Sequence, residues 1–161
     1  MSVNVIYGSD AGATRAVASR IAKRVQGKAI DVAQATTADF ETCSLLILGS
    51  PTYGAGDLQT DWEFGGLDKL AAANLAGKKV ALFGTGDQAS YPDSFVDAMG
   101  LLYDQVVAKG AIVVGFTATA GYDYTASKAE RDGKFVGLAL DEDGESSKSD
   151  KRITAWISQL L

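Results

Sequence analysis

The stretch "SLLILGSPTYGAG", residues 44–56, runs from an unbroken apolar segment straight into a glycine-rich loop. A strand with one face in water alternates apolar and polar residues, whereas Leu45–Leu48 is apolar throughout. Continuous apolar strands are typical of parallel sheets that helices cover on both faces. Such sheets bind ligands beyond the carboxyl ends of their strands, which is where this loop begins. We therefore expect a buried strand over residues 44–50 and a ligand-binding loop directly after it.

The same apolar pattern recurs along the chain and alternates with helical periodicity. In residues 11–25, Val17, Ile21 and Val25 recur at every fourth position, which predicts an amphipathic helix. A short helix or turn is expected over residues 36–43, and further helices over residues 61–75, 93–110 and 149–161. Further strands are expected over residues 2–8, 28–33, 78–86, 111–118 and 136–141. This alternation predicts an α/β fold with a parallel sheet covered by helices on both sides.

Three segments depart from this regular pattern. The pair Gly65–Gly66 interrupts the segment 61–75, so we expect an irregular helix there. Residues 119–135 are polar with weak periodicity, and the pattern alone assigns them no element. Residues 141–150 are predicted to form an acidic loop.

Length and composition narrow the function classes. The chain has 161 residues, of which 47% are hydrophobic, and we expect a single domain over residues 1–161 with a substantial core. Cys43 is the one cysteine, and there is no histidine. These counts exclude an internal disulfide, a Ser-His-Asp triad, a histidine zinc site and histidine-ligated haem. Any redox chemistry therefore requires a borrowed cofactor.

Charge and hydropathy bear on partners and location. The net charge of −5 disfavours a nucleic-acid partner, because phosphate binding favours Lys and Arg. Residues 57–104 contain eight acidic residues against three lysines, whereas residues 1–30 contain five basic residues against one acidic residue, so we expect a negative end and a more basic flank. No apolar run approaches the roughly 20 residues of a membrane span, and "MSVNVIYG" does not resemble a signal peptide. We expect a cytoplasmic protein without a membrane partner.

The segment "GSDAGATR", residues 8–15, joins the first strand to the first helix. Gly8 and Gly12 are predicted to allow a tight turn, while Ser9 and Thr14 supply hydroxyls. The first amides of the helix lack partners within the helix and point into this loop. Together these groups favour binding of a phosphate or another anion.

A plain strand-to-helix turn, with Ser9 or Asp10 capping the helix, is an equally open interpretation of this loop. Neither the Walker A motif nor the G-x-G-x-x-G fingerprint is present, so nucleoside triphosphate hydrolysis is not expected. A phosphate bound as a passive anchor fits better, and the spacing of Arg15 also allows a solvent-facing side chain. A phospho-acceptor domain would need an Asp where this chain has Ser50.

Two tyrosines follow neighbouring strands. Tyr53 lies in the loop after strand 44–50, and Tyr91 lies in the loop "GTGDQASYPDSF" over residues 84–95. Two aromatic rings at one edge of the sheet can hold a flat ligand between them. A single loop tyrosine is more often half-buried packing, but two of them beside a phosphate-type loop favour the ligand.

The segments "SPTYGAGDLQTDWEFGGLDKL" and "FGTGDQASYPDSFVDAMGLLYDQV" closely resemble flavodoxins of the long-chain type. The resemblance extends over nearly the whole chain and includes "RDGKFVGLALDEDGESSKSDKRITAWISQL". It implies a flavodoxin-like, doubly wound, five-stranded parallel sheet of order 2-1-3-4-5. It also implies that an insertion at about residues 118–135 interrupts strand 5, so that the apolar runs flanking it are halves of one strand.

The resemblance further implies a low-potential one-electron carrier with one non-covalent FMN, rather than an enzyme. Its expected partners are redox proteins with basic docking surfaces, such as flavodoxin/ferredoxin-NADP reductase or nitrogenase reductase. It implies a monomer with no metal and no catalytic residue. The alternative on the same fold is an FMN-dependent NAD(P)H quinone or nitro reductase. A module that binds another phosphorylated aromatic compound without redox chemistry is a third interpretation.

Carried over by position, the resemblance assigns the phosphate to the loop from Ser9 to Thr14 and the ribityl chain to the neighbourhood of Thr52 and Asp143. It places the ring between Tyr53 and Tyr91. The expected cofactor-binding residues are Ser9, Asp10, Ala11, Gly12, Ala13, Thr14, Ser50, Pro51, Thr52, Tyr53, Gly54, Ala55, Gly56, Thr85, Gly86, Asp87, Tyr91, Ser94 and Asp143.

Three positions depart from the family pattern. The family usually has a hydroxyl residue where this chain has Ala11, and often a polar residue where it has Ala13. The loss of one charge-assisted hydrogen bond costs about 1.5–3 kcal/mol where nothing replaces it, so weaker FMN binding is expected. The family commonly has Trp where this chain has Tyr53, which keeps an aromatic ring but reduces its stacking area.

Overall fold

The structure, a computed structural model, describes residues 2–10, 12–53 and 56–161. Within these residues, the main sheet has six parallel strands, of which the sixth, described below, pairs with part of β4. The other five follow the order β2-β1-β3-β4-β5, as predicted. They are β1 (Val3–Tyr7), β2 (Lys28–Asp31), β3 (Leu45–Pro51), β4 (Lys79–Thr85) and β5 (Ile112–Val114).

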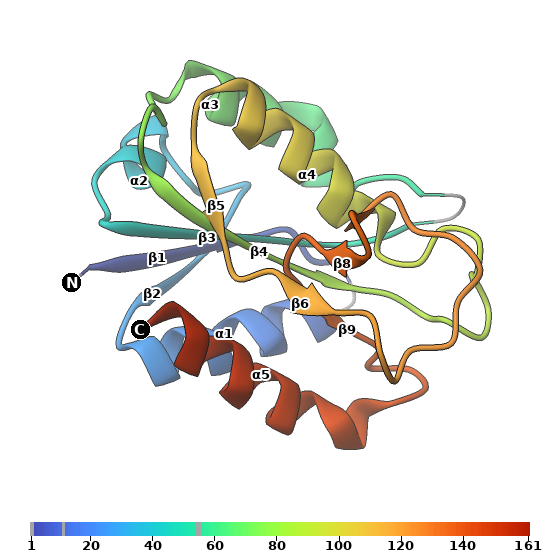
Figure 1. Cartoon of the computed structure of the whole chain (residues 1–161). Helices are drawn as coiled ribbons and strands as arrows, with labels where there is room; N and C mark the ends of the chain where they lie inside the picture. The colour runs from blue at the N-terminus through green and yellow to red at the C-terminus, as the bar shows by residue number, and fades with distance from the viewer. Residues whose placement is uncertain (1, 11, 54–55) are drawn as a thin grey trace.

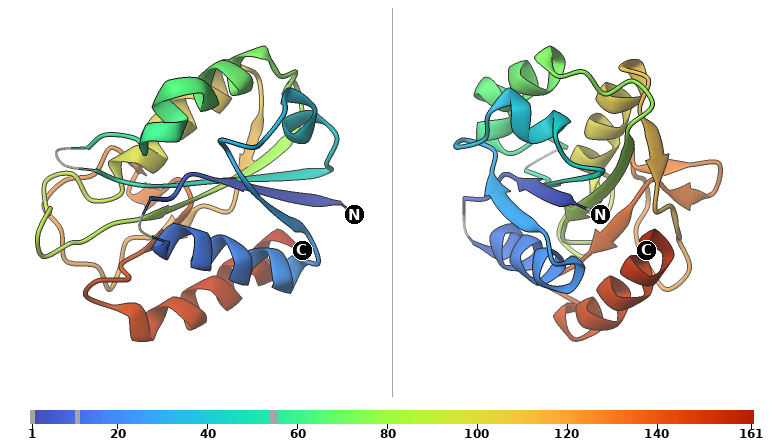
Figure 2. Two further views of the ribbon diagram at one scale, coloured as in Figure 1. Left: turned by 180° about the vertical axis from the view of Figure 1, so that it is seen from behind. Right: turned by 90° about the vertical axis from the view of Figure 1, so that its left-hand side faces the viewer.

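Helices cover both faces of the sheet (Figures 1 and 2). α1 (Ala13–Val25) and α5 (Ser146–Leu160) lie on one face. α2 (Thr37–Glu41), α3 (Leu67–Ala72) and α4 (Asp97–Ala108) lie on the other. The fold is therefore doubly wound, and its ligand edge is expected where the strand order reverses between β1 and β3.

The apolar run of β3 serves two separate cores. Leu46 and Leu48 pack with residues of α4 in one cluster, whereas Leu45 and Ile47 pack with residues of α1 and α5 in the other. All four side chains are buried, at no more than 3% exposure. Because successive side chains of a strand point to opposite faces, a strand covered on both sides needs apolar residues at every position.

The fifth strand is interrupted, as the resemblance implied. β5 pairs with Lys79–Ala81 of β4, and β9 (Leu138–Leu140) pairs with Phe83–Thr85 of the same strand. Both halves run parallel to β4, so the two apolar runs flanking the insertion are halves of one strand.

The segment between β5 and β9 folds into a second, small sheet that the sequence pattern did not predict. Its antiparallel strands follow the order β6-β8-β7 and are β6 (Thr117–Ala118), β7 (Glu130–Arg131) and β8 (Lys134–Phe135). Each strand has only two residues, which is too short for a periodic signal. Tyr122, Tyr124 and Phe135 pack around Phe95, with ring centroids 5.5–6.0 Å from its own, and attach this segment to the main core.

Local backbone geometry shifts the start of one helix and makes another irregular. α4 begins at Asp97 rather than at residue 93, because Val96 adopts a left-handed conformation with φ of 48°. The irregular helix expected over 61–75 is confirmed. A π-helical turn, η1 (Trp62–Gly66), precedes α3, and Phe64 and Gly65 within it have non-helical dihedral angles.

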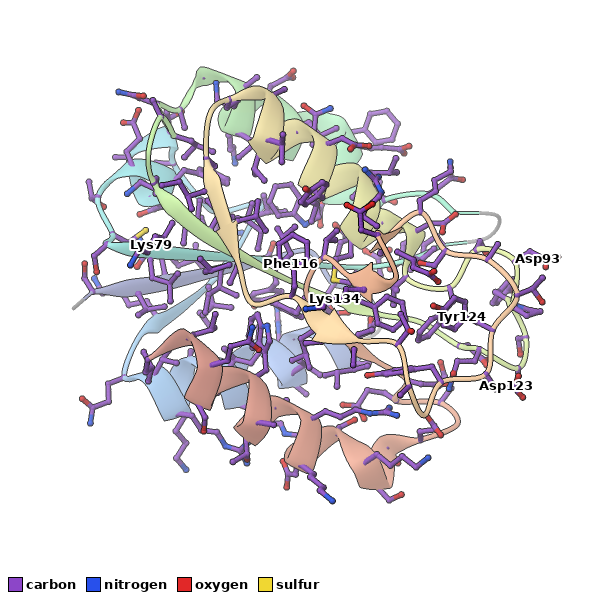
Figure 3. The ribbon with its side chains drawn as sticks, in the orientation of Figure 1. Lys79, Asp93, Phe116, Asp123, Tyr124 and Lys134 are labelled. Atoms are coloured by element: carbon purple, nitrogen blue, oxygen red, sulfur yellow. The ribbon has the colours of Figure 1, made fainter. Side chains whose placement is uncertain are left out.

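The loops that follow β1, β3 and β4 gather at one end of the molecule, and both termini lie at the other (Figures 1 and 2). Asp93, Asp123 and Tyr124 lie at the loop end, whereas Lys79 lies at the opposite end (Figure 3). Among the described residues, no helix combines the length and the apolar character that crossing a membrane requires.

Candidate functional site

The carboxyl ends of β1, β3 and β4 surround a cavity of about 220 Å³. Residues from four segments line it: the loop after β1, the loop after β3, the loop after β4 and the turn after β9. The sequence-predicted residues that it brings together are Ser9, Asp10, Ala13, Thr14, Pro51, Thr52, Tyr53, Thr85, Gly86, Asp87, Tyr91 and Asp143. The sequence therefore predicted most of this wall, although its segments lie far apart in the chain.

Four predicted residues lie beside this cavity rather than in its wall: Gly12, Ser50, Gly56 and Ser94. Ser50 is fully buried, and its hydroxyl donates to the Pro51 carbonyl oxygen at 2.8 Å. The backbone N–H of Ser94 donates to the Tyr91 carbonyl oxygen at 3.4 Å. The predicted contacts of these four residues with a cofactor stay predictions. Ala11, Gly54 and Ala55 lie outside the described residues.

The loop after β1 closes onto the start of α1. Gly12 adopts φ of 93°, and its N–H donates to the Ser9 hydroxyl oxygen at 3.2 Å. One residue later α1 begins, and its first N–H groups have no acceptor within the helix. Thr14 and Thr85 are both buried, and their hydroxyl oxygens lie 3.0 Å apart, which joins this loop to β4.

Gly8 provides space rather than the tight turn predicted for it. A Cβ atom there would lie 2.1 Å from Gln59 Oε1, so only glycine permits this approach. The buried Gln59 side chain uses the space to donate from Nε2 to Asp10 Oδ1 at 2.8 Å and to Asp61 Oδ2 at 2.9 Å. Gln59, in the loop after β3, thus fixes the carboxylate of Asp10 in the loop after β1.

Tyr53 is held by its backbone and by its hydroxyl. Its N–H donates to the Asp57 carbonyl oxygen at 2.8 Å, and the Asp57 N–H donates to the Tyr53 carbonyl oxygen at 2.8 Å, so the two residues are paired. The phenolic O–H donates to Asp10 Oδ2 at 2.7 Å. Burial, followed by the bond to Asp10, raises the pKa of Tyr53 to about 12, so this hydroxyl remains a proton donor at neutral pH.

Tyr91 reaches the same cavity from the loop after β4. Tyr91 is 50% exposed. Its N–H donates to the Asp87 carbonyl oxygen at 2.9 Å, while Asp87 Oδ1 accepts from the Ser90 N–H at 3.1 Å, so a local turn presents both residues. Two phenol rings from neighbouring loops therefore line one cavity, as the sequence predicted.

A buried carboxylate lies behind the loop after β3. Asp97 is 3% exposed, and its Oδ1 accepts from the Lys128 N–H at 2.7 Å. A Cβ atom on Gly56, whose φ is 119°, would lie 2.7 Å from Asp97 Oδ2. Burial raises the pKa of the Asp97 carboxyl, while the contact with Lys128 opposes this rise. No sequence pattern pointed to this contact.

Glu142 also lines the cavity, and sequence reasoning missed it. Its Oε1 accepts from Arg20 Nη1 of α1 at 3.2 Å, and Arg20 also forms an ion pair with Asp150 of α5. Asp143, the neighbouring predicted residue, is exposed. The available signal was the acidic run directly after the apolar run 136–141.

The structure refines the predicted charge segregation. Of the acidic residues in 57–104, Asp97 is buried and Asp104 forms an ion pair with Arg131 at 3.0 Å. Asp87 lines the cavity, and Asp93 lies at the same end of the molecule (Figure 3). The loop end is therefore acidic, but less so than the sequence count implies.

The basic flank is likewise largely paired. Arg15 donates from Nε to the Tyr7 hydroxyl oxygen at 3.2 Å and lies 3.7 Å from Asp31, so its charge is directed toward β2. Arg24 forms an ion pair with Asp150 at 3.2 Å. These pairs leave the cavity with helix amides and hydroxyls as its donors rather than with basic side chains.

The donors of the cavity suit a ligand with three chemically different parts. The loop before α1 offers hydroxyls and helix N–H groups, which suit an anion. Thr52 and Thr85 line the same cavity, and Thr52 N–H donates to the Thr85 carbonyl oxygen at 3.1 Å. Tyr53 and Tyr91 offer aromatic faces. Together they fit a phosphate, a polyol and a flat ring system.

Comparisons with known proteins agree with this geometry. The flavodoxin family model matches residues 5–156. Flavodoxin from Synechocystis sp. (strain ATCC 27184 / PCC 6803 / Kazusa) is 44% identical over 162 residues, which cover 98% of this chain and 95% of the relative. Flavodoxin from Synechococcus elongatus (strain ATCC 33912 / PCC 7942 / FACHB-805) is 43% identical with the same coverage.

A solved structure resembles the whole fold. The crystal structure of Fusobacterium nucleatum flavodoxin bound to flavin mononucleotide superposes with a TM-score of 0.92 at 34% sequence identity. The match covers 99% of this chain and 96% of that one. The insertion between β5 and β9 is thus part of an architecture that the two chains share over nearly their full lengths.

Proposed function

The chain belongs to the flavodoxin family, and on that premise we propose that its cavity holds one non-covalent FMN for electron transfer between proteins. When bound, FMN supplies the ring system that takes up and releases electrons. The protein is an electron carrier rather than an enzyme. Its own residues bind the cofactor, exclude water from part of it and set the surrounding charge.

At one end of the cavity, the loop before α1 holds the phosphate. Ser9 and Thr14 line the cavity with their hydroxyl-bearing side chains, and the N–H groups at the start of α1 have no acceptor within the helix. Thr52 and Thr85 also line the cavity, as does Asp143 from the turn after β9. This donor set supports binding of the phosphate without a lysine or arginine.

At the other end, the rings of Tyr53 and Tyr91 hold the flavin by stacking. The carboxylates of Asp87 and Asp143, which also line the cavity, disfavour an added negative charge. A carboxylate about 12 Å away opposes such a charge by roughly 0.7 kcal/mol at an effective dielectric constant of about 40. That corresponds to about 30 mV for a one-electron couple, so several carboxylates lower the potential appreciably.

The observation that carries this proposal is the presence of both tyrosines and the phosphate-type loop in the wall of one cavity. The test is titration of the FMN-free protein with FMN and with riboflavin, followed by quenching of flavin fluorescence. We expect one FMN per chain and weaker binding of riboflavin, which lacks the phosphate. Absence of FMN binding, or equal affinity for the two flavins, would contradict the proposed site.

A second experiment separates a carrier from a flavin reductase. The FMN-loaded protein is mixed with NADPH alone, and then with NADPH and a catalytic amount of a flavodoxin reductase. We expect slow reduction in the first mixture and fast reduction in the second, because Tyr53 and Tyr91 both line the cavity where a nicotinamide would have to stack. Rapid reduction by NADPH alone would favour the reductase interpretation.

We further infer that its redox partners dock through basic surfaces. Asp87 and Asp143 line the cavity, and Asp93 lies at the same end of the molecule. Electrostatic attraction between such surfaces accelerates association and weakens with salt. The rate of reduction by a reductase should therefore fall as ionic strength rises. The cytoplasmic location and the monomeric state stay predictions, which cell fractionation and sedimentation would test.

A further inference from the structure

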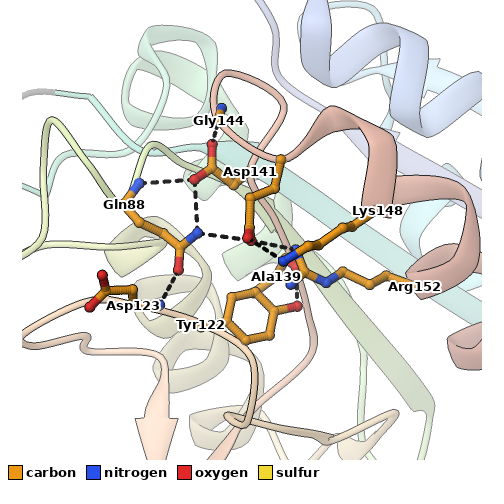
Figure 4. Close-up of polar contacts among 9 residues, drawn as sticks. Gln88, Tyr122, Asp123, Ala139, Asp141, Gly144, Lys148 and Arg152 are labelled. Carbon is orange, nitrogen blue, oxygen red and sulfur yellow. Dashed lines mark hydrogen bonds and ion pairs between the residues drawn. The ribbon is translucent and has the colours of Figure 1, made fainter.

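The Gln88 side chain joins three segments of the chain beside the cavity (Figure 4). Its Nε2 donates to Asp141 Oδ2 at 3.0 Å and to Glu145 Oε1 at 2.9 Å. Its Oε1 accepts from the backbone N–H of Asp123, which lies in the segment between β5 and β9. Gln88 is only 7% exposed, so these bonds replace hydrogen bonds to water.

Two of these segments form walls of the cavity. Gln88 directly follows Asp87, which lines the cavity from the loop after β4. Asp141 directly precedes Glu142 and Asp143, which line the cavity from the turn after β9. The Gln88 N–H also donates to Asp141 Oδ2 at 3.2 Å, so backbone and side chain together set the spacing of the two walls.

The third segment contributes no residue to the cavity wall. Residues 119–126 approach the network through the Asp123 N–H and through Tyr122, whose hydroxyl donates to the Ala139 carbonyl oxygen at 2.6 Å. The Arg152 guanidinium lies 4.0 Å from the centre of the Tyr122 ring and donates to Glu145 Oε1 at 3.1 Å. The insertion is thus bonded to the groups that position the cavity walls, although residues 119–126 do not line the cavity themselves.

We propose that Gln88 is a positioning residue that couples the insertion to the cofactor cavity. A ligand that fixes the two cavity walls also fixes the Gln88 amide, and the amide in turn holds the Asp123 N–H. Coupling of this kind is reciprocal, so the insertion contributes to cofactor affinity by the same factor by which the cofactor steadies the insertion. The inference rests on the proposed function, because FMN is the ligand that it invokes.

The amide has a chemical role that other residues of its size lack. Asp141 and Glu145 are carboxylates that need donors, whereas the Asp123 N–H needs an acceptor, and a carboxamide supplies both. Gln88→Leu removes the three side-chain bonds, so the Asp123 N–H loses its acceptor, whereas Asp141 still accepts from the Gln88 and Gly144 N–H groups. Gln88→Glu keeps an acceptor for Asp123 but places a third carboxylate beside Asp141 and Glu145.

The test is hydrogen–deuterium exchange of the full chain, read by mass spectrometry, with and without FMN. In the wild type, FMN should slow exchange of peptides that contain Asp123 by at least about fivefold, the lower end of usual coupling factors. In Gln88→Leu this FMN-dependent slowing should disappear, and the dissociation constant for FMN should rise by about the same factor. If Gln88→Leu does not fold, Gln88→Glu is measured instead: its carboxylate cannot donate to Asp141 and Glu145 and repels both, so the slowing at Asp123 should again disappear.

Gln159→Leu is the matched control. Gln159 Nε2 of α5 donates to the Phe116 carbonyl oxygen at 3.0 Å, so it holds the same insertion at its base but does not line the cofactor cavity. This variant should speed exchange near Phe116 while keeping the FMN-dependent slowing at Asp123. A merely structural role for Gln88 predicts the same behaviour for both variants.

The outcomes separate the two proposals. If the wild type does not bind FMN, the proposed function fails, and this inference fails with it. If the wild type binds FMN but exchange at Asp123 is unchanged, or if Gln88→Leu retains the full slowing, only the positioning role is overturned.

Discussion

The Tyr53 hydroxyl donates to the Asp10 carboxylate at 2.7 Å, and so joins the loop after β3 to the loop after β1. Asp10 is fixed in turn by the Gln59 amide at 2.8 Å. The phenol ring that faces the cavity is therefore oriented by a carboxylate from the phosphate-type loop. A tryptophan, whose N–H lies elsewhere on a larger ring, could not form this bond in the same position.

Removal of the Tyr53 hydroxyl should loosen the ring while keeping its aromatic face. We expect Tyr53→Phe to weaken FMN binding by about fivefold, which corresponds to one hydrogen bond of about 1 kcal/mol. Fluorescence titration measures the change. Tyr124→Phe is the control, because the Tyr124 hydroxyl also binds a carboxylate, that of Glu130, and Tyr124 does not line the cavity. Equal affinities in the two variants would contradict a role for the Asp10 bond.

Substitution of Gly56 should lower the free energy of unfolding by more than its positive φ alone would cause. Gly56 and Gly121 both have positive φ, at 119° and 88°. A Cβ atom on Gly121 meets nothing within 4 Å, whereas one on Gly56 lies 2.7 Å from Asp97 Oδ2. We expect Gly121→Ala to lower the free energy of unfolding by about 1 kcal/mol and Gly56→Ala by about 2–4 kcal/mol. Urea unfolding of the FMN-free protein gives both values. Comparable losses in the two variants would show that the Asp97 side chain moves away from the added Cβ atom at little cost.

Arg20 should shield the cofactor from Glu142. The two side chains form an ion pair at 3.2 Å, and Glu142 lines the cavity. In Arg20→Gln the carboxylate is left uncompensated, so we expect FMN, an anion, to bind about threefold to fivefold more weakly at low salt and nearly normally at high salt.

Arg131→Gln provides the comparison for Arg20→Gln. Arg131 pairs with Asp104 at 3.0 Å, and its side chain is 36% exposed, against 35% for Arg20. Neither member of that pair lines the cavity. A similar loss of affinity in both variants would point to a general change in net charge rather than to Glu142.

The buried Asp97 carboxyl should make stability depend on pH. Burial raises its pKa above the ordinary value of 3.8, so the folded state binds this proton more tightly than the unfolded state does. Its contribution to the free energy of unfolding is therefore complete below that value and is lost as pH rises through the folded-state pKa. Asp97→Asn has no such proton.

The difference in unfolding free energy between Asp97→Asn and the wild type should consequently shift in favour of the variant as pH rises from about 4 to about 7. The amide oxygen of the variant can still accept the hydrogen bond that the Lys128 N–H donates to Asp97 Oδ1 at 2.7 Å in the wild type. Urea unfolding at several pH values measures the difference. A difference that stays constant over this range would mean that Asp97 titrates alike in both states.

The strands could be predicted because their residues carry the signal themselves. Leu45–Leu48 are buried on alternate faces, and only a strand covered on both sides makes that pattern favourable. The part of the cavity wall that could be predicted lies where an aromatic residue closely follows such a strand, as Tyr53 follows β3. The two-residue strands of the insertion have no such period, so only the resemblance to a family located that segment.

The rest of the site depends on contacts between distant residues. Gln59 reaches Asp10 only because Gly8 has no side chain, and Glu142 is directed by Arg20, which lies 122 positions earlier in the chain. The residues that flank Gln59 and Glu142 in the sequence do not indicate either contact. The sequence count placed Asp97 among the surface charges, because hydrophobic periodicity does not indicate whether the first residue of a helix is buried.

The interrupted edge strand has a consequence for how the chain can be shortened. Val114 is paired with Ala81 and Leu138 with Phe83, so Leu82 is the single residue of β4 that separates the two registers. One residue in place of 115–137 would therefore restore an unbroken ladder, spanning about 6.6 Å between Val114 and Leu138. The insertion thus leaves the edge strand and returns to it in the same register. Its excision would expose Phe95 to solvent without changing the pairing of any residue of β4.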